Sequence, residues 1–390
     1  MKRNFSISAL NHGTCIFVYT SCMLLFGLNS MFAQSVVTNL KYNNQSVQSA
    51  NTTVMLPGNG GSSSVLKVGD QLQSGTRLII PPYTIVMLQS PAGRQICSSI
   101  KGKTMEYTVK MTPKGENHYV RGQGAQVKSY VNKSVGYNYR VNNGRGTTSA
   151  ARGTEFTFTD MSAGNNEQAI ITTEEGSINI IDQVPLSING QSAPTNKRGE
   201  PITQAVSRMQ SAGDQQFYSS DQPIEYADYS QAISYISNEI YNIIDPEERA
   251  DNLLCLGDLY MDFDQPQNAV DPFNQARLIF EEYYGPDDLY TLEAVISMSE
   301  AIAKSGDVQN ANAWIGNAYN ILVELANWNV EDLNYLDTLD YFEEEDHEAY
   351  DIISSELSEI YGLIGWAYEV TGDVSSEYYY DLMSKYALKY

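Results

Sequence analysis

The C-terminal half of the sequence contains two segments that match at a distance of 42 residues, and this repeat constrains the fold more than any other feature. In each copy, small and apolar residues follow one another at steps of three and four, the spacing of one helix face. Each copy therefore predicts a pair of helices that buries its apolar face only against a neighbouring copy. The matching positions are Leu253, Leu256, Gly257, Tyr260, Ala269, Phe273 and Ala276 in the first copy, and Val295, Met298, Ser299, Ile302, Ala311, Ile315 and Ala318 in the second.

A weaker third copy follows, in which Gly365 matches Gly257 and Glu377 replaces the alanine expected in the second helix. A small residue that faces an aromatic one lets two antiparallel helices pack closely, and this pattern resembles the tetratricopeptide repeat. The motif YGPDDLYTLEA, residues 284–294, is similar to the repeats of kinesin light chains. The resemblance implies an all-α array whose first helices line a concave groove for a peptide or protein.

The predicted groove positions are mostly acidic. If a basic or amphipathic segment of a partner protein binds there, its association rate should fall as salt rises. The alternative is that the carboxylates only keep the array soluble. The predicted groove residues are Asp251, Leu254, Asp258 and Asp262 in the first copy, and Glu293, Ile296 and Glu300 in the second.

The charge of the chain divides near residue 200. Residues 35–200 contain 16 Lys and Arg against 10 Asp and Glu, whereas residues 201–390 contain 6 against 37. Because phosphates are repelled by carboxylates, the acidic half excludes nucleic acid as its partner. An acidic surface is otherwise simply well solvated.

Residues 63–183 predict an all-β domain. Short apolar runs are separated by Gly-Asp, Ser-Gly and Pro-Pro, and Phe156 and Phe158 alternate with threonines. The segment resembles the FecR family in Gly69-Asp70, in Gly153, Thr154 and Phe156 of ARGTEF, and in Glu175, Gly176, Ile178 and Ile180 of TTEEGSINI. The resemblance implies a FecR-like β domain.

The remaining boundaries follow from composition. Residues 34–62 are rich in Asn and Ser and predict a flexible N-terminal segment, while the Pro- and Gly-rich residues 184–203 predict a linker. Residues 204–390 predict the helical repeats, with an acidic insertion at about 326–350. We therefore expect two modules, first all-β and then all-α, each with its own core.

Residues 1–33 predict a secretory signal peptide. Lys2 and Arg3 precede a short apolar run, and the small residue Ala33 marks a cleavage site. No later stretch is long and apolar enough to span a membrane, so we expect an exported protein without a membrane span after processing. The alternative is an uncleaved anchor helix.

The sequence offers little chemistry for catalysis. Of the four cysteines, Cys97 and Cys255 lie after the signal peptide, and we expect both to be buried free thiols. No pattern combines a nucleophile, a base and an orienting group, and no run has the ordered ligand spacing of a metal site. We therefore expect a non-enzymatic, exported binding or scaffolding protein without a cofactor. The alternative is a membrane-anchored component of envelope signal transduction.

Overall fold

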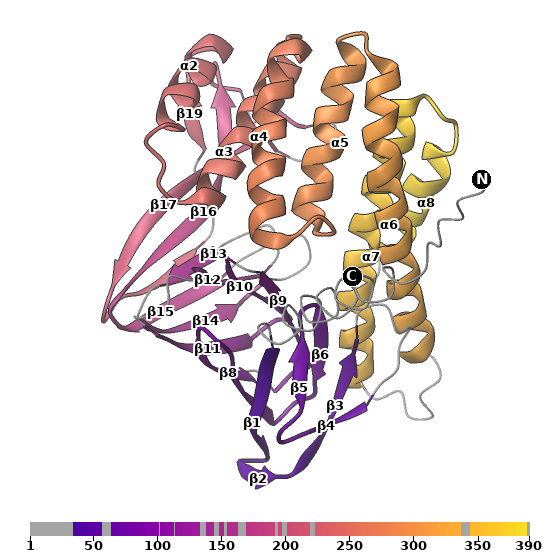
Figure 1. The fold of residues 1–390 in the computed structure, drawn as a ribbon. Helices are drawn as coiled ribbons and strands as arrows, with labels where there is room; N and C mark the ends of the chain where they lie inside the picture. The colour runs from indigo at the N-terminus through magenta and orange to yellow at the C-terminus, as the bar shows by residue number, and fades with distance from the viewer. Residues whose placement is uncertain are drawn as a thin grey trace, which may run out of the picture.

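The computed structural model describes residues 34–56, 64–100, 102–112, 114–132, 138–143, 148–151, 154–162, 169–191, 194–196, 201–218, 223–336 and 344–387. The described part has an N-terminal region of sheets followed by a run of helices, as the sequence predicts (Figure 1). The expected signal peptide, residues 1–33, lies outside the described residues. No helix among the described residues has the length and apolar character needed to cross a membrane.

The strands form two large, mostly antiparallel sheets. The nine-stranded sheet has the order β18-β15-β14-β11-β8-β7-β1-β2, with β5 paired to β1. Its strands are β1 (Gln34–Tyr42), β2 (Gln45–Val47), β5 (Gln71–Gln73), β7 (Thr84–Gln89), β8 (Gly93–Ser99), β11 (Ala125–Val131), β14 (Glu155–Asp160), β15 (Ala169–Glu175) and β18 (Gln215–Tyr218).

The ten-stranded sheet has the order β17-β16-β13-β12-β10-β9-β6-β3-β4, with β19 paired to β16. Its strands are β3 (Ser49–Met55), β4 (Ser64–Lys67), β6 (Thr76–Ile80), β9 (Met105–Thr112), β10 (Gly115–Arg121), β12 (Asn138–Asn142), β13 (Thr148–Ala151), β16 (Ser177–Ile188), β17 (Thr203–Ser211) and β19 (Ile224–Tyr226).

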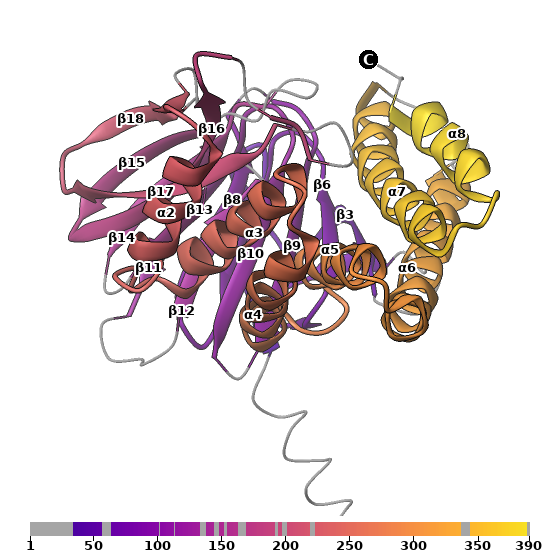
Figure 2. The ribbon, with the colours of Figure 1, turned by 90° about the horizontal axis from the view of Figure 1, so that it is seen from above.

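The two sheets enclose one apolar core. Strand β9 shows the arrangement: Met105, Tyr107 and Val109 point into the core, while the residues between them face the other side of the sheet. Phe156 and Phe158, predicted from their alternation, are fully buried in the same core. The outer face of the ten-stranded sheet is polar, and the helices cover part of it (Figure 2).

The prediction that residues 34–62 form a flexible segment is wrong for the described residues. Strands β1 and β3 belong to the two sheets, and Val37, Leu40 and Val54 are buried in the shared core. The many Asn and Ser residues misled the interpretation because Ser46, Ser49 and Asn51 occupy exposed strand positions, while Asn43 and Asn44 form the turn between β1 and β2.

The predicted boundary at residues 184–203 is also wrong. Strand β16 continues to Ile188, and β17, which starts at Thr203, pairs with it. Leu186, Ile188 and Ile202 pack against helices, so this segment joins the two parts in one core. The helices begin at Tyr229 rather than at residue 204.

Seven helices follow the strands in the described part of the chain. The first, α2 (Tyr229–Glu239), precedes three packed pairs. The pairs are α3 (Pro246–Asp262) with α4 (Pro266–Tyr284), α5 (Leu289–Lys304) with α6 (Val308–Leu336), and α7 (Glu344–Thr371) with α8 (Ser376–Ala387). Residues 326–336 of the predicted acidic insertion continue α6, where Ala326 and Leu333 are buried, and residues 344–350 lie in α7.

The small residues of the repeat lie at close helix contacts. A Cβ built on Gly257 would lie 2.3 Å from Cε1 of Phe273, which is itself buried between α3 and α4. In the third pair, a Cβ on Gly365 would lie 2.9 Å from ring carbons of Tyr380. Glycine therefore sets the spacing within the first and third pairs.

We expect Gly257→Ala to lower the free energy of unfolding by about 1–3 kcal/mol, because the buried Phe273 ring must move to admit the methyl group. The matched control is Gly316→Ala in α6, where the added methyl group meets open space. That change should raise stability by about 0.5–1 kcal/mol, since alanine is the better helix former. Urea denaturation measures both. Equal effects of the two substitutions would contradict the packing role of Gly257.

Buried ion pairs fasten the helices to the ten-stranded sheet. Arg140 of β12 is almost fully buried and pairs with Glu247 in the first turn of α3 and with Asp245, which caps that helix. The Tyr284 hydroxyl accepts a further hydrogen bond from Arg140 Nη1 at 3.2 Å. Burial of Arg140 opposes its charge, but Glu247 outweighs that effect and raises the arginine pKa. The two parts therefore share a charged interface.

We expect Arg140→Ala to lower the free energy of unfolding by about 3–5 kcal/mol, because it leaves Glu247 buried without its cation. Lys67→Ala, at an exposed position of the edge strand β4, removes the same charge and should change stability by less than about 0.5 kcal/mol. Denaturant melts followed by circular dichroism measure both. If the two variants were equally stable, the two parts would be independent modules, as the sequence first suggested.

Candidate functional site

A pocket of about 280 Å³ lies where the C-terminal halves of α3, α5 and α7 come together. Its acidic side chains are Asp258 and Asp262 of α3 and Glu300 of α5, three of the residues that the sequence predicted for the groove. Trp366 of α7 and Phe273 of α4 add apolar surface. The walls thus come mainly from the first helix of each pair, the helices that the repeat pattern assigned to the groove.

Glu300 organises the pocket. Its Oε2 accepts a hydrogen bond from Trp366 Nε1 at 2.9 Å, and its Oε1 lies 2.8 Å from the ammonium group of Lys304 one turn later. The Glu300 side chain is only 7% exposed, whereas Lys304 is 49% exposed. The carboxylate therefore fixes the buried indole on one side and holds a cation at the mouth on the other.

The two aspartates lie one helical turn apart on α3. Asp262 is exposed and accepts a hydrogen bond from the Tyr229 hydroxyl, and the Tyr229 ring stacks on Phe263. Asp258 is half-buried, deeper in the pocket. Thr195 and Asn196, from the segment between β16 and β17, close another side. The pocket is thus acidic, with one cation already at its edge.

The other predicted groove residues lie elsewhere. Asp251 Oδ2 accepts a hydrogen bond from Gln183 Nε2 of β16 at 2.8 Å, so this carboxylate faces the sheet. Burial, followed by the nearby charge of Glu247, raises the pKa of Asp251 well above its usual value. Leu254 packs against apolar clusters between helices, Ile296 is fully buried, and Glu293 is buried. These four do not line the pocket.

Asp251 is separated from Asp258 and Asp262 because the face of α3 that carries them has different neighbours along its length. The N-terminal half of α3 lies on the sheet, where Glu248 accepts a hydrogen bond from the Ser207 backbone and Asn252 donates one to the Ala205 carbonyl. The C-terminal half extends past the sheet and leaves its face open. Helical spacing predicts which residues of α3 share a face, but it cannot predict how far along the helix the sheet covers that face.

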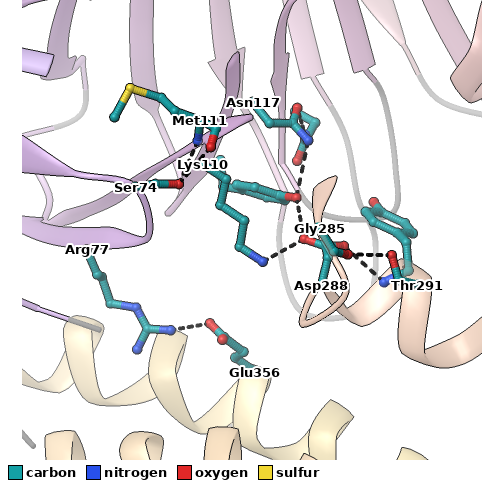
Figure 3. A network of polar contacts seen from close by, with 12 residues as sticks. Ser74, Arg77, Lys110, Met111, Asn117, Gly285, Asp288, Thr291 and Glu356 are labelled. Atoms are coloured by element: carbon teal, nitrogen blue, oxygen red, sulfur yellow. Dashed lines mark hydrogen bonds and ion pairs between the residues drawn. The ribbon is translucent and has the colours of Figure 1, made fainter. Parts of the chain in front are cut away.

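Helices α5 and α7 also make polar contacts with side chains of the ten-stranded sheet (Figure 3). Asp288, the N-cap of α5, accepts a hydrogen bond from Tyr119 and pairs with Lys110 Nζ at 2.6 Å. Glu356 of α7 pairs with Arg77 at 2.5 Å and with Arg121 at 3.4 Å. Sequence analysis missed this network. Two sequence features could have indicated it. Arg77, Lys110 and Arg121 occupy polar positions of alternating strands, and Asp288 directly precedes a helix.

Asp332 of α6 completes the cluster around Arg77, with Oδ2 at 3.4 Å from Nη1. Burial raises the pKa of Asp332 to about 6, although Arg77 acts in the opposite direction. Its ordinary value is 3.8, so at pH values between 3.8 and about 6 the carboxyl is protonated in the folded chain but ionised in the unfolded one. Its contribution to stability is therefore fully present below pH 3.8 and lost as the pH rises through about 6.

We expect Asp332→Asn to become more stable relative to the original chain as the pH rises from 4 to 8, because asparagine cannot ionise. The gain should be about 1–3 kcal/mol. The control is Glu324→Gln, an exposed carboxylate on the same helix, which should show no such trend. Unfolding free energies across this pH range decide the matter, and a constant difference between Asp332→Asn and the original chain would contradict it.

Both cysteines of the described part are free and buried, as predicted. Burial raises the pKa of the Cys97 thiol, and burial followed by nearby Asp258 raises that of Cys255. Among the residues that the structure describes, no group of three or more His, Cys, Asp or Glu side chains is placed to hold a metal ion.

Comparison with known proteins identifies no family for this chain. No protein-family model matches the chain, and no curated protein matches it either. The FecR and tetratricopeptide resemblances accordingly rest on the motif residues themselves.

Proposed function

We propose that this protein is a non-enzymatic binding or scaffolding protein whose acidic pocket takes a basic side chain from a segment of a partner protein. The observation that carries the proposal is the convergence of Asp258, Asp262 and Glu300 beside Trp366 in one open pocket. Carboxylates beside an aromatic ring provide both attraction and a flat apolar surface for a Lys or Arg side chain.

The chain itself contains a cation in this position. The ammonium group of Lys304 lies against Glu300 at the pocket mouth. Elsewhere in the helical array, the Arg277 guanidinium group lies 5.2 Å from the centre of the Trp314 ring, which shows the same pairing of a cation with an aromatic side chain. Half of the Lys304 side chain is exposed, so a partner's cation can compete with it for Glu300. The lining combines carboxylates with an aromatic ring and one cation at the edge, which are the groups that hold a charged side chain.

The wider proposal follows the sequence. A FecR-like β part and a tetratricopeptide-like array would form an exported scaffold of the cell envelope or exterior, after removal of residues 1–33. The acidic pocket would be the contact for a basic or amphipathic partner, and nucleic acid is excluded by the charge of the helical half.

The test uses a panel of labelled short peptides that present Lys or Arg beside an apolar residue, with Glu-containing peptides of the same length for comparison. We expect the basic peptides to bind more tightly at low salt, and Asp258→Asn with Asp262→Asn to weaken them by a factor of about 10 or more. Fluorescence anisotropy measures the affinity.

The control is Asp271→Asn, which removes an exposed carboxylate from α4 outside the pocket. Its affinity should stay within a factor of about 2 of the original value, since a surface charge contributes little. Equal weakening by the control would show a general charge effect and would remove the pocket from consideration. Full affinity of the double variant would have the same consequence.

A further inference from the structure

Strand β17 forms one end of the ten-stranded sheet. Among the described strands it pairs only with β16, so its other edge carries backbone N–H and C=O groups that no described strand binds. The direction of these groups alternates along a strand. Because the Ile202 carbonyl accepts a hydrogen bond from the Leu186 N–H of β16, the even-numbered residues bond to β16. The odd-numbered residues from Thr203 to Ser211 therefore direct their N–H and C=O groups outward.

Two side chains of α3 bind this edge. Glu248 Oε1 accepts a hydrogen bond from the Ser207 N–H at 3.1 Å, and Asn252 Nδ2 donates one to the Ala205 carbonyl at 2.8 Å. A neighbouring strand would supply an acceptor for the first of these backbone groups and a donor for the second. The two side chains thus provide the hydrogen bonds that the backbone of a further strand would make.

The Asn252 amide is positioned as a donor. It is only 1% exposed, and its Nδ2 also donates to the Glu248 carbonyl at 2.9 Å, whereas its Oδ1 is buried without a hydrogen-bond partner among the described residues. A buried oxygen without a donor costs free energy. An aliphatic side chain would avoid that cost but would leave the Ala205 carbonyl without its donor. The contact with β17 therefore accounts for an asparagine at this buried position.

The edge is bound near its end as well. Asp214, after the turn that follows β17, accepts a hydrogen bond at Oδ2 from the Ser211 N–H at 3.0 Å. Between the two contacts lies Met209, whose side chain is 68% exposed. Polar side chains thus bind outward-facing backbone groups on both sides of Met209.

An antiparallel edge centred on Ser207 is complementary to itself. Two copies related by a two-fold axis would join each Ser207 N–H to the Ser207 carbonyl of the other copy, and each Ala205 carbonyl to the Met209 N–H of the other copy. Exposed strand edges associate in this way unless charged side chains, helices or bulges cover them. Glu248 and Asn252 bind two of the groups on which such a dimer would depend.

We propose that Glu248 and Asn252 take the place of a neighbouring strand and thereby keep β17 from pairing with β17 of a second copy of this chain. These residues belong to the N-terminal half of α3, whereas its C-terminal half forms a wall of the acidic pocket. One helix therefore covers the sheet edge at one end and builds the pocket at the other.

The experiment measures the dissociation constant of the dimer by sedimentation velocity of the full chain over a range of concentrations. We expect Glu248→Ala with Asn252→Ala to lower this constant by a factor of about 10 or more, because the exposed backbone groups then form hydrogen bonds between the two copies. Hydrogen exchange should show new protection of the Ser207 and Met209 amides at high concentration. A double variant that dissociates as readily as the original chain would overturn the proposal.

A third substitution locates the contact. Ser207→Pro, added to the double variant, removes an outward N–H that β16 does not use, and proline is tolerated at such a position of an edge strand. The triple variant should return to the dissociation constant of the original chain. Dimers that persist in the triple variant would form through another surface, and this result would also overturn the proposal.

The matched control is Asn320→Ala with Glu324→Ala, which removes the same two types of side chain, one helical turn apart, from exposed positions of α6. Its dissociation constant should equal that of the original chain, and a decrease as large as that of the double variant would show a general effect of lost charge and overturn the proposal. Circular dichroism checks that each variant is folded. If the double variant unfolds, Glu248→Ala alone decides, since Glu248 is half-buried and Asn252 stays in place. It should lower the constant by a factor of about 3, and no decrease would contradict the role of Glu248.

Discussion

The pairing of cations on the sheet with carboxylates near the starts of helices is the constraint on which the rest of this structure depends. Asp245 and Asp288 each cap a helix and also bind a cation of the sheet, Arg140 or Lys110. Each helix N-terminus favours a negative charge, and each buried cation requires one. Buried ion pairs contribute little stability compared with apolar packing, but any other placement of these helices would leave charges buried and unpaired. The pairs therefore select one arrangement.

This interface explains the uneven charge of the chain. The excess of cations before residue 200 and of carboxylates after it had two interpretations from sequence alone, a solvated surface or attraction to a basic partner. Some of the carboxylates do meet a basic surface, but that surface belongs to the same chain. Asp251, predicted for a groove, also turns to the sheet, where it accepts a hydrogen bond from the neutral amide of Gln183. Asp258 and Asp262 lie beyond the sheet and keep the open position that the repeat pattern predicted.

The order of sheets and helices could be predicted from the sequence, because it rests on short-range periodicity. The repeat correctly placed Gly257 opposite Phe273, since a helix pair of this kind must pack through its smallest residue. The alternation of apolar and polar residues in β9 was equally clear. It distinguishes the apolar face of the strand from the polar one, but it does not predict whether solvent or helices cover the polar face. Glu106, Thr108 and Lys110 resemble a solvent-facing row, and only the position of α5 and α7 turns them into the wall of a cavity.

The position of the cationic strands early in the chain has a consequence for biosynthesis. Arg121 leaves the ribosome well before Glu356, and at roughly 5–20 residues per second the gap between them takes on the order of 10–50 s. Throughout that interval Arg77 and Arg121 have not yet met Glu356. The order of translation thus makes α7 the last element to reach the sheet, so the two parts can reach their final contact only when synthesis is nearly complete.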